Sequence, residues 1–394
     1  MRSTAARILL ASALSLLLSP QSRAQITFSA LGDLAGGTTV SEILGLSANG
    51  TVAVGYSQSA AGYEAIRWTQ AGGMVSLGDL SGGATTAFAR AASSDGSIVV
   101  GAGTSASGTE TFQWTSAGGM TGLGDLAGGS FSSTAYGISA DGTVVAGTGN
   151  AGSTQAYRWT SGGGMVGLGF LPGGATNSSQ VRGISSDGTV IVGFSSSSTG
   201  SGSEAFRWTE AGGMVGLGLL PGATLTSEAH AVSSNGSVIV GRSYNSSTNQ
   251  EAFRWTQSGG MVGLGDLAGG TVYSDAYGVS GDGSIVVGNS QGASGNEAYY
   301  WTATTGMVSL QTYLTGQGVD LTGWTLRNVW AISSDGTTLA GSGLHNGNTE
   351  GFIVSGLNLT AVPEPSTYAA IAGLASLGAA AGWRRRRNRP KPGE

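Results

Sequence analysis

A repeat of about 46 residues fills most of this 394-residue chain and constrains its fold more than any other feature. One copy occupies residues 228–267 and contains four short segments, which we name A to D. Their patterns are Ala-Tyr-Gly-Ile-Ser for A, Thr-Val-Val-Ala-Gly for B, Glu-Ala-Phe-Arg-Trp-Thr for C and Met-Val-Gly-Leu-Gly-Asp-Leu for D. Four short strands recurring at about 40–50 residues are typical of a propeller blade.

Turn sequences separate the segments. The tryptophan of segment C recurs at residues 68, 114, 159, 208, 255 and 301. Between segments A and B stands an Asn-Gly or Asp-Gly pair, preceded two residues earlier by serine, and these pairs begin at Asn49, Asp95, Asp141, Asp187, Asn235, Asp282 and Asp335. A side-chain acceptor followed by glycine, which tolerates positive φ, predicts a tight hairpin.

The two ends of the repeat array are offset. The array opens with a lone segment D at residues 28–34 and ends with segments A, B and C but no D. Pairing these ends would complete a seventh unit and remove the exposed edges of the sheet array. An open solenoid would gain nothing from this offset. We therefore predict an all-β fold over residues 25–357, a seven-bladed β-propeller of four-stranded blades, closed by an N-terminal strand that joins the last blade.

The combined pattern resembles the extracellular HAF-repeat family. Over about residues 27–355, the chain repeats L-G-D-L-x-G-G, then A-x-x-I-S-x-D-G-x-V-V-G-x-S, then E-A-F-R-W. The resemblance implies a propeller-like fold and no settled activity. The chain departs from the family at the histidine of the His-Ala-Phe signature, which is replaced by Glu64, Glu110, Gln155, Glu204, Glu251, Glu297 and Glu350. No role of that histidine is therefore carried over.

The N-terminus has the features of an export signal. Residues 1–24 contain Arg2 and Arg7, then an apolar run at residues 8–19, then small residues before Gln25. The run is too short for a membrane anchor, so we predict a signal peptide cleaved between Ala24 and Gln25.

The C-terminus has three parts. A linker at residues 358–366 contains Pro363, Glu364 and Pro365, and residues 367–394 contain an uncharged run and then four arginines, Arg384, Arg385, Arg386 and Arg387. Sixteen helical residues reach about 24 Å, a short single transmembrane-type helix, and the arginines would stay on the cytoplasmic side. This arrangement resembles a PEP-CTERM sorting signal, also called the ice-binding protein C-terminal domain.

The resemblance of the tail to a sorting signal implies how the protein is processed and where it is located. The partner would be an exosortase-type protease, with transient anchoring in the inner membrane and release to the cell surface or matrix of a Gram-negative-type bacterium. A permanent single-span anchor is the alternative.

Composition and motifs exclude several classes of function. The chain has no cysteine, hence no disulfide framework and no thiolate metal site. Once the leader and tail are set aside, eight cations face twenty acids, so we expect no nucleic-acid partner. There is no G-x-S-x-G, no H-E-x-x-H and no calcium-loop spacing. We therefore expect no metal and no cofactor, and we assign no catalytic residue.

One position of segment A varies while its neighbours are monotonous. It holds Leu44, Arg90, Tyr136, Arg182, His230, Tyr277 and Trp330. By analogy with other propellers, segment A lines the central channel, and this position shares a face with the variable residue two places earlier. We predict a binding site for a saccharide or peptide made of Arg90, Tyr136, Arg182, His230, Tyr277 and Trp330. The alternative is that these large side chains only plug the channel.

These features favour a secreted, surface- or matrix-sorted protein with a non-catalytic binding or structural role. Its expected partners are exopolysaccharide or cell-surface proteins. A polysaccharide-acting enzyme, of lyase or glycosidase type, is the alternative. Ice binding rests only on the alternative name of the tail, and flat Thr-x-Thr ladders are absent from the sequence.

Overall fold

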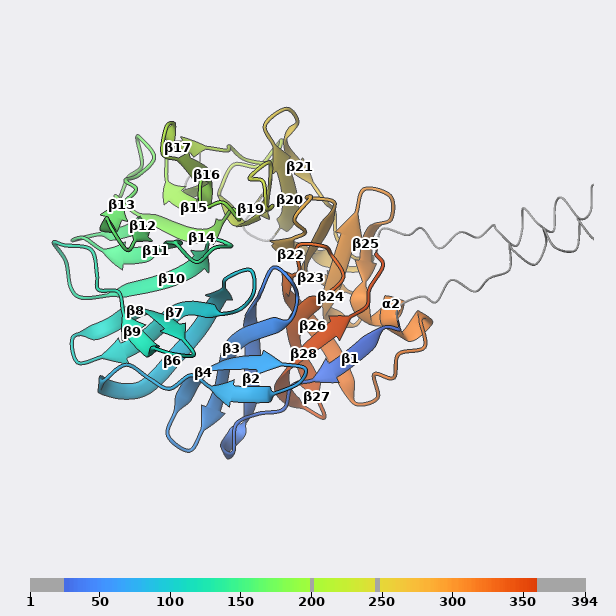
Figure 1. The fold of residues 1–394 in the computed structure, drawn as a ribbon. Coiled ribbons are helices and arrows are strands. Elements are labelled where there is room, and N and C mark those ends of the chain that lie inside the picture. Colours follow the sequence, from blue (N-terminus) through green and yellow to red (C-terminus); the bar gives the residue numbers. More distant parts are fainter. Residues whose placement is uncertain (1–24, 199–201, 245–248, 360–394) are drawn as a thin grey trace, which may run out of the picture.

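The structure, a computed structural model, describes residues 25–198, 202–244 and 249–359, and this part of the chain is almost entirely β-structure (Figure 1). The predicted signal peptide, the Pro-Glu-Pro of the linker and the hydrophobic segment with its arginines lie outside the described residues. Within the described ranges, no helix is both long and apolar enough to cross a membrane.

The described strands form seven four-stranded units. Unit 1 contains β2 (Gly36–Leu46), β3 (Val52–Ser59), β4 (Tyr63–Thr69) and β5 (Gly73–Ser76). Unit 2 contains β6 (Gly82–Ala92), β7 (Ile98–Ser105), β8 (Gly108–Thr115) and β9 (Gly119–Gly122). Unit 3 contains β10 (Ser133–Ile138), β11 (Val144–Asn150), β12 (Thr154–Thr160) and β13 (Gly164–Gly167). Unit 4 contains β14 (Ser179–Ile184), β15 (Ile191–Ser196), β16 (Ser203–Thr209) and β17 (Gly213–Gly216).

The remaining units follow the same order. Unit 5 contains β18 (Ser227–Val232), β19 (Val238–Tyr244), β20 (Gln250–Thr256) and β21 (Gly260–Gly263). Unit 6 contains β22 (Gly269–Val279), β23 (Ile285–Gly292), β24 (Gly295–Thr302) and β25 (Gly306–Ser309), followed by the helix α2 (Leu310–Gly316). Unit 7 contains β26 (Trp324–Ile332), β27 (Leu339–His345), β28 (Asn348–Ser355) and, from the other end of the chain, β1 (Thr27–Ala30).

The units are arranged around a common centre (Figure 1). The pairing expected from the offset ends is present, because β1 lies antiparallel to β28. The first strand of unit 1, β2, in turn contacts β26, β27 and β28 of unit 7. No single described sheet closes on itself, so the circle is completed by contacts between units.

A ring of backbone hydrogen bonds links the seven A–B turns. Each bond joins the residue before the Asx-Gly pair, or in one case Asn49 of that pair, to the next turn, with N···O distances of 2.8–3.1 Å. The last bond, from Ser334 N to Ala48 O, connects unit 7 back to unit 1. The ring therefore fixes the relative position of all seven units at one end of their common axis.

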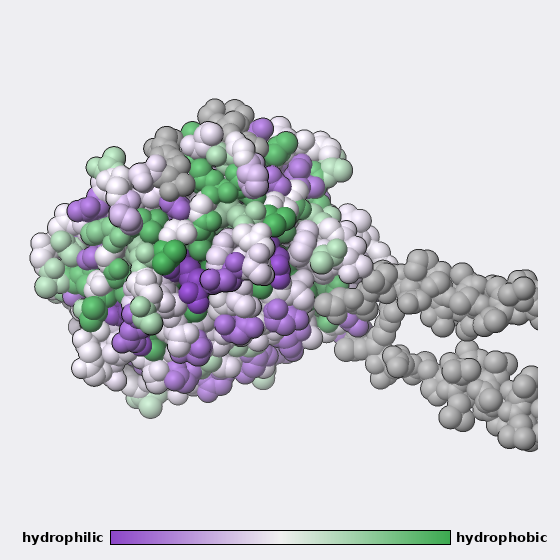
Figure 2. All heavy atoms as spheres, turned by 90° about the horizontal axis from the view of Figure 1, so that it is seen from above, coloured by the Kyte–Doolittle hydropathy of each residue, from purple (hydrophilic) through white to green (hydrophobic). Residues whose placement is uncertain are grey.

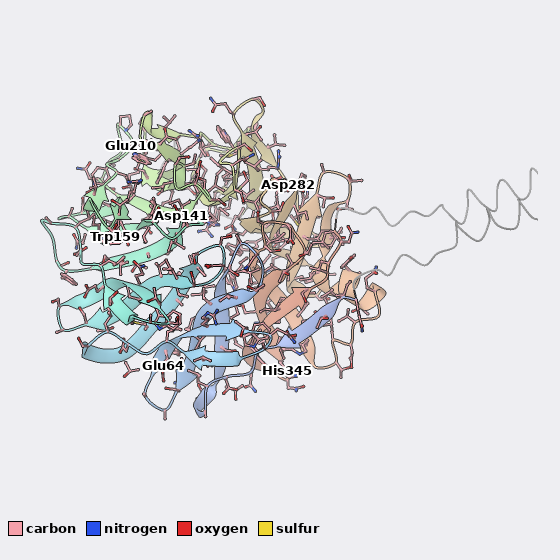
Figure 3. All side chains as sticks on the ribbon, viewed as in Figure 1. Glu64, Asp141, Trp159, Glu210, Asp282 and His345 are labelled. Atoms are coloured by element: carbon pink, nitrogen blue, oxygen red, sulfur yellow. The ribbon has the colours of Figure 1, made fainter. Side chains whose placement is uncertain are left out.

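The acids of the A–B turns build those turns, as the sequence predicts. In unit 3, Ser139 Oγ donates to Asp141 at 2.6 Å, the Thr143 N–H donates to it at 3.0 Å, and Gly142 has φ 76°. Similar hydrogen bonds from Ser97 lower the pKa of Asp95 to about 2. Figure 3 places Asp141 and Asp282 in different units, well apart. Their carboxylates are engaged locally.

Buried serines link several units to the preceding one, and glutamates of segment C link segments C and D of one unit. Ser227 Oγ in β18 donates to Gly218 O at 2.6 Å and accepts from the Ala205 N–H of the preceding unit at 2.9 Å. Glu204, the first residue of segment C in unit 4, accepts from the Gly218 N–H at 2.9 Å. Glu110, Glu251 and Glu350 make the same kind of bond. These glutamates therefore hold the end of segment D in their own unit.

Replacing Ser227 by alanine is expected to lower the free energy of unfolding by about 1–3 kcal/mol, because the buried Ala205 N–H and Gly218 carbonyl lose their partner. Urea or thermal unfolding measures this loss. Ser258→Ala, at an exposed serine of unit 5, is the matched control and is expected to change stability by less than about 0.5 kcal/mol. Equal stabilities of the two variants would contradict the assigned connection.

The hydrophobic core lies between neighbouring units. Phe206, Phe253 and Phe352 of segment C are fully buried, and clusters combine residues of adjacent units, such as Val192 with Phe253. Because both faces of a unit pack on neighbouring units, few side chains remain available for binding. The side chains that face the axis of the circle are among those that remain.

Candidate functional site

The variable position of segment A is a β-bulge in all seven described units. The antiparallel register with the next strand skips one residue at the same place each time, and the skipped residues are Leu44, Arg90, Tyr136, Arg182, His230, Tyr277 and Trp330. A bulge inserts an extra residue, bends the strand and redirects its side chain. In each described unit, the β-bulge therefore occurs at the residue that does not repeat.

Most of these residues meet in one cavity. Of the six predicted site residues, Arg90, Tyr136, Arg182, His230 and Tyr277 line an open cavity of about 230 Å³. Trp330 is not among its described lining residues, but its ring lies 4.4 Å from that of Tyr277, centroid to centroid. The bulged strands thus bring all six predicted residues to one region on the axis.

The cavity extends from this layer toward the A–B turns, because its other lining residues follow the bulge along each strand. Its wall is aliphatic and consists of Leu46, Ile138, Ile184, Val232, Val279 and Ile332. Its turn end carries Ala48, Ser94, Ala140, Ser186, Ser234, Gly281 and Ser334.

The side chains of the layer stack on one another. The guanidinium carbons of Arg90 and Arg182 each lie 4.7 Å from the centre of the Tyr136 ring. The rings of His230 and Tyr277 are parallel within 8°, with centroids 5.5 Å apart. Because neighbouring side chains already contact these tyrosine rings, the hydrogen-bonding groups at the ring edges and the guanidinium groups are the features best placed to receive a ligand.

Around His230, the layer contains a balanced ionic network. Arg242 of β19 contacts Glu228 at 2.8 Å and Asp275 at 2.9 Å. His230 Nδ1 lies 3.0 Å from Asp275 Oδ1, outside hydrogen-bond alignment, and its Nε2 lies 3.4 Å from Glu228. The side chain of Asp275 is fully buried. With His230 protonated, two anions face two cations.

The network shifts the pKa of His230 and of Arg242. Burial lowers the pKa of His230, but the charge of the nearby Asp275 and the contact with Glu228 outweigh it and raise the pKa above its usual value. Burial acts in the same direction on Arg242, and Asp275 and Glu228 again outweigh it and raise its pKa. The network therefore favours charged forms.

The opposite side of the layer is not balanced. Neither Arg90 nor Arg182 forms an ion pair within the described residues, and the buried Nε of Arg90 has no hydrogen-bond partner there. Arg182 donates a long hydrogen bond of 3.4 Å to Gln180. Burial, together with the charge of Arg182, lowers the pKa of Arg90. Arginine side chains keep their positive charge in proteins.

One carboxyl group of the same strand layer behaves differently. Burial raises the pKa of Glu42, while a hydrogen bond with Tyr56 opposes the shift. Tyr56 packs edge-on against Phe88 and Tyr63, with ring centroids 5.0 and 5.6 Å apart.

Across the described part of the chain, no three His, Asp or Glu side chains gather as metal ligands do.

The other predicted signals lie at the ends. The described residues do not include Ala24, Pro363, Glu364, Pro365 or the arginines at 384–387.

A second hollow, of about 1200 Å³, lies beside β1 and α2, and its lining includes Gln25 and Leu359. Figure 2 shows hydrophilic and hydrophobic residues interspersed over the face seen from above.

A comparison with protein families identifies the tail. The PEP-CTERM protein-sorting motif matches residues 361–387. The motif implies export, processing by an exosortase and sorting to the surface. It covers a small part of the chain, so it identifies the address and leaves the activity open. None of the curated proteins matches the chain.

Solved structures share the fold. A prolyl endopeptidase structure is 13% identical with a TM-score of 0.52, covering 88% of this chain and 54% of its own. An oligogalacturonate lyase in complex with manganese is 10% identical with a TM-score of 0.51, covering 85% of this chain and 91% of its own. TolB from Acinetobacter baumannii is 12% identical with a TM-score of 0.45, covering 65% of this chain and 62% of its own.

The chain therefore spans less than two thirds of the TolB and endopeptidase chains that it resembles. At these identities, the similarity shows an all-β, propeller-type fold and nothing about activity. Together, the comparisons establish a surface-sorting signal attached to a propeller-type body.

Proposed function

We propose that this chain is a surface-sorted, seven-bladed β-propeller whose axial cavity binds an extracellular ligand without catalysis. One observation carries the proposal. The residues that do not repeat sit on bulges and converge on one cavity, while the repeated polar residues are engaged in hydrogen bonds within and between units. Selection for folding alone explains the repeated residues, and ligand recognition explains the variable ones.

The address supports an extracellular partner. The sorting motif delivers the chain to the cell surface, where exopolysaccharide and surface proteins are the available partners. The resemblance of the repeat to HAF repeats agrees with this location. The signal peptide at residues 1–24 and exosortase processing near Pro363, Glu364 and Pro365 complete the proposed route.

The binding proposal is tested by substituting Tyr136, Tyr277 and Trp330 by alanine, singly and together. Binding to a glycan array is expected to fall by about tenfold or more in the triple variant, because the stacked layer that positions the cavity groups is lost. Tyr63→Ala, at an exposed tyrosine of β4, is the matched control and is expected to bind normally. Circular dichroism separates lost binding from lost folding.

Unchanged binding by a folded triple variant would contradict the proposal and favour the alternative, in which these side chains only plug the channel. Binding that is lost in the control as well would place the ligand elsewhere on the unit.

A polysaccharide-acting enzyme is the second candidate, and Glu42 is the observation that favours it. Its carboxyl group has a pKa raised by burial, as a general acid requires, and Glu228 occupies the equivalent strand position with a lowered pKa. Product analysis after incubation with acidic and neutral polysaccharides separates the two candidates. Shortened or unsaturated products would establish the enzyme, and an unchanged polymer supports the binder.

A further inference from the structure

Arg90 and Arg182 are two cations without an acid in an acidic protein. They flank the same ring, that of Tyr136, and both line the axial cavity. The body of the chain carries eight cations against twenty acids, yet neither guanidinium group has an ion-pair partner among the described residues. Such a pair of like charges is unfavourable until an anion joins it.

Elsewhere in the same strand layer, another arginine has its charge neutralised by carboxylates. Arg242 has two carboxylates within 2.9 Å, Glu228 and Asp275. Its charge therefore needs no ligand. Glu42 is engaged by Tyr56 through a hydrogen bond. Among the described residues that line the cavity, the cations without a carboxylate partner are Arg90 and Arg182, on the side formed by units 2, 3 and 4.

The shape of the cavity restricts the anion. Its volume of about 230 Å³ is below the range of about 300–1,000 Å³ typical of drug-sized ligands, so it suits one sugar-sized group. Aliphatic side chains form its wall, and serines, including Ser94 and Ser186, lie at its turn end. A planar carboxylate matches the planar fork of a guanidinium group in two parallel hydrogen bonds.

We infer that Arg90 and Arg182 form an anion subsite that binds the carboxylate of an acidic sugar, such as the terminal uronate of an extracellular polysaccharide. The carboxylate lies at the edge of the Tyr136 ring, where it faces both guanidinium groups. The sugar ring lies against the aliphatic wall, and its hydroxyl groups face the serines of the A–B turns. This inference rests on the proposed binding function of the cavity and adds the chemical class of the ligand.

The test is calorimetric titration of the full-length chain in a detergent without sugar. The probes are trigalacturonate, neutral galactotriose, sodium sulfate, sodium phosphate and a short peptide with a free C-terminal carboxylate. Trigalacturonate is expected to bind at least about tenfold more tightly than galactotriose. Arg90→Gln and Arg182→Gln are each expected to weaken its binding about tenfold, because each removes a charge-assisted hydrogen bond. Added salt is expected to weaken it further.

Arg207→Gln is the matched control, since Arg207 stands on β16 and does not line the cavity. It is expected to bind trigalacturonate like the wild type. If Arg90→Gln does not fold, Arg90→Lys replaces it, which keeps the charge, removes the planar fork and is expected to bind more weakly than the wild type.

The outcomes separate the inference from the proposed function. Equal binding of trigalacturonate and galactotriose, or unchanged binding by folded arginine variants, overturns the anion subsite and leaves a binding cavity in place. Tighter binding of sulfate or phosphate overturns the carboxylate assignment, and tighter binding of the peptide overturns the sugar. Absence of binding to every probe and to the glycan array overturns the proposed function and the inference together.

Discussion

Replacing Asp275 by alanine is expected to lower the free energy of unfolding by about 3–5 kcal/mol, one of the largest single effects in the chain. Asp275 is fully buried and contacts Arg242 at 2.9 Å and His230 at 3.0 Å. Its removal leaves the buried His230 and the partly exposed Arg242 with Glu228 as their remaining carboxylate partner. Chemical unfolding in urea measures the loss.

The control for this experiment is Glu210→Ala. Glu210 is an exposed acid of unit 4, labelled at the edge of the molecule in Figure 3. Its replacement is expected to change stability by less than about 0.5 kcal/mol. A loss of under about 1 kcal/mol in Asp275→Ala would contradict the buried network.

The same network gives stability a pH dependence with a definite sign. Burial alone would lower the pKa of His230, but Asp275 and Glu228 raise it. A group with a raised pKa in the folded state stabilises the fold fully below its unfolded pKa, about 6.5 for histidine, and less as the pH rises through the folded value. The wild type is therefore expected to lose stability above about pH 6.5. Asp275→Ala is expected to lose less over that interval, because the main cause of the raised pKa is gone.

A disulfide between Thr27→Cys and Ser355→Cys is expected to form spontaneously in air and to stabilise the chain by up to about 4–5 kcal/mol. The two residues are direct partners in the β1–β28 pair, and the chain has no cysteine of its own to interfere. The cross-link joins the two ends of the strand array, so it removes much of the conformational freedom of the unfolded chain. Thermal unfolding with and without reductant measures the gain.

The matched control pairs Thr27→Cys with Ser258→Cys of unit 5. These residues belong to different units and are not strand partners, so no intramolecular cross-link is expected. A failure of the first pair to cross-link would contradict closure of the circle by the N-terminal strand. Equal cross-linking of both pairs would show that the ends are not fixed.

Much of the fold follows from residues that repeat. The Ser-x-Asx-Gly turns specify their own hairpins, because Asp141 or its equivalent bonds its neighbours within five residues. The offset ends predict the β1–β28 pair, since a lone strand and an incomplete unit complete each other. The turn residues and the offset ends of the repeat array are therefore enough to predict most of the architecture.

The residues of the candidate site could be proposed from the sequence, but their geometry could not. Variation at one position among constant neighbours identified Arg90, Tyr136 and Arg182. The alternation of apolar residues in the sequence does not reveal the β-bulge at that position. It also does not reveal that the two arginines stack on the Tyr136 ring. Both depend on how seven strands meet at the axis, which no single repeat contains. The role of Glu204 in holding the end of segment D was also missed.

The central claim is that ligand binds in the axial cavity beside the bulged residues. A crystal structure of the protein grown with trigalacturonate tests it most directly. The account predicts sugar density in the cavity, with a carboxylate within about 3 Å of the guanidinium groups of Arg90 and Arg182. Density only in the hollow beside β1 and α2, or on the outer strands of the units, with the axial cavity empty, would contradict it.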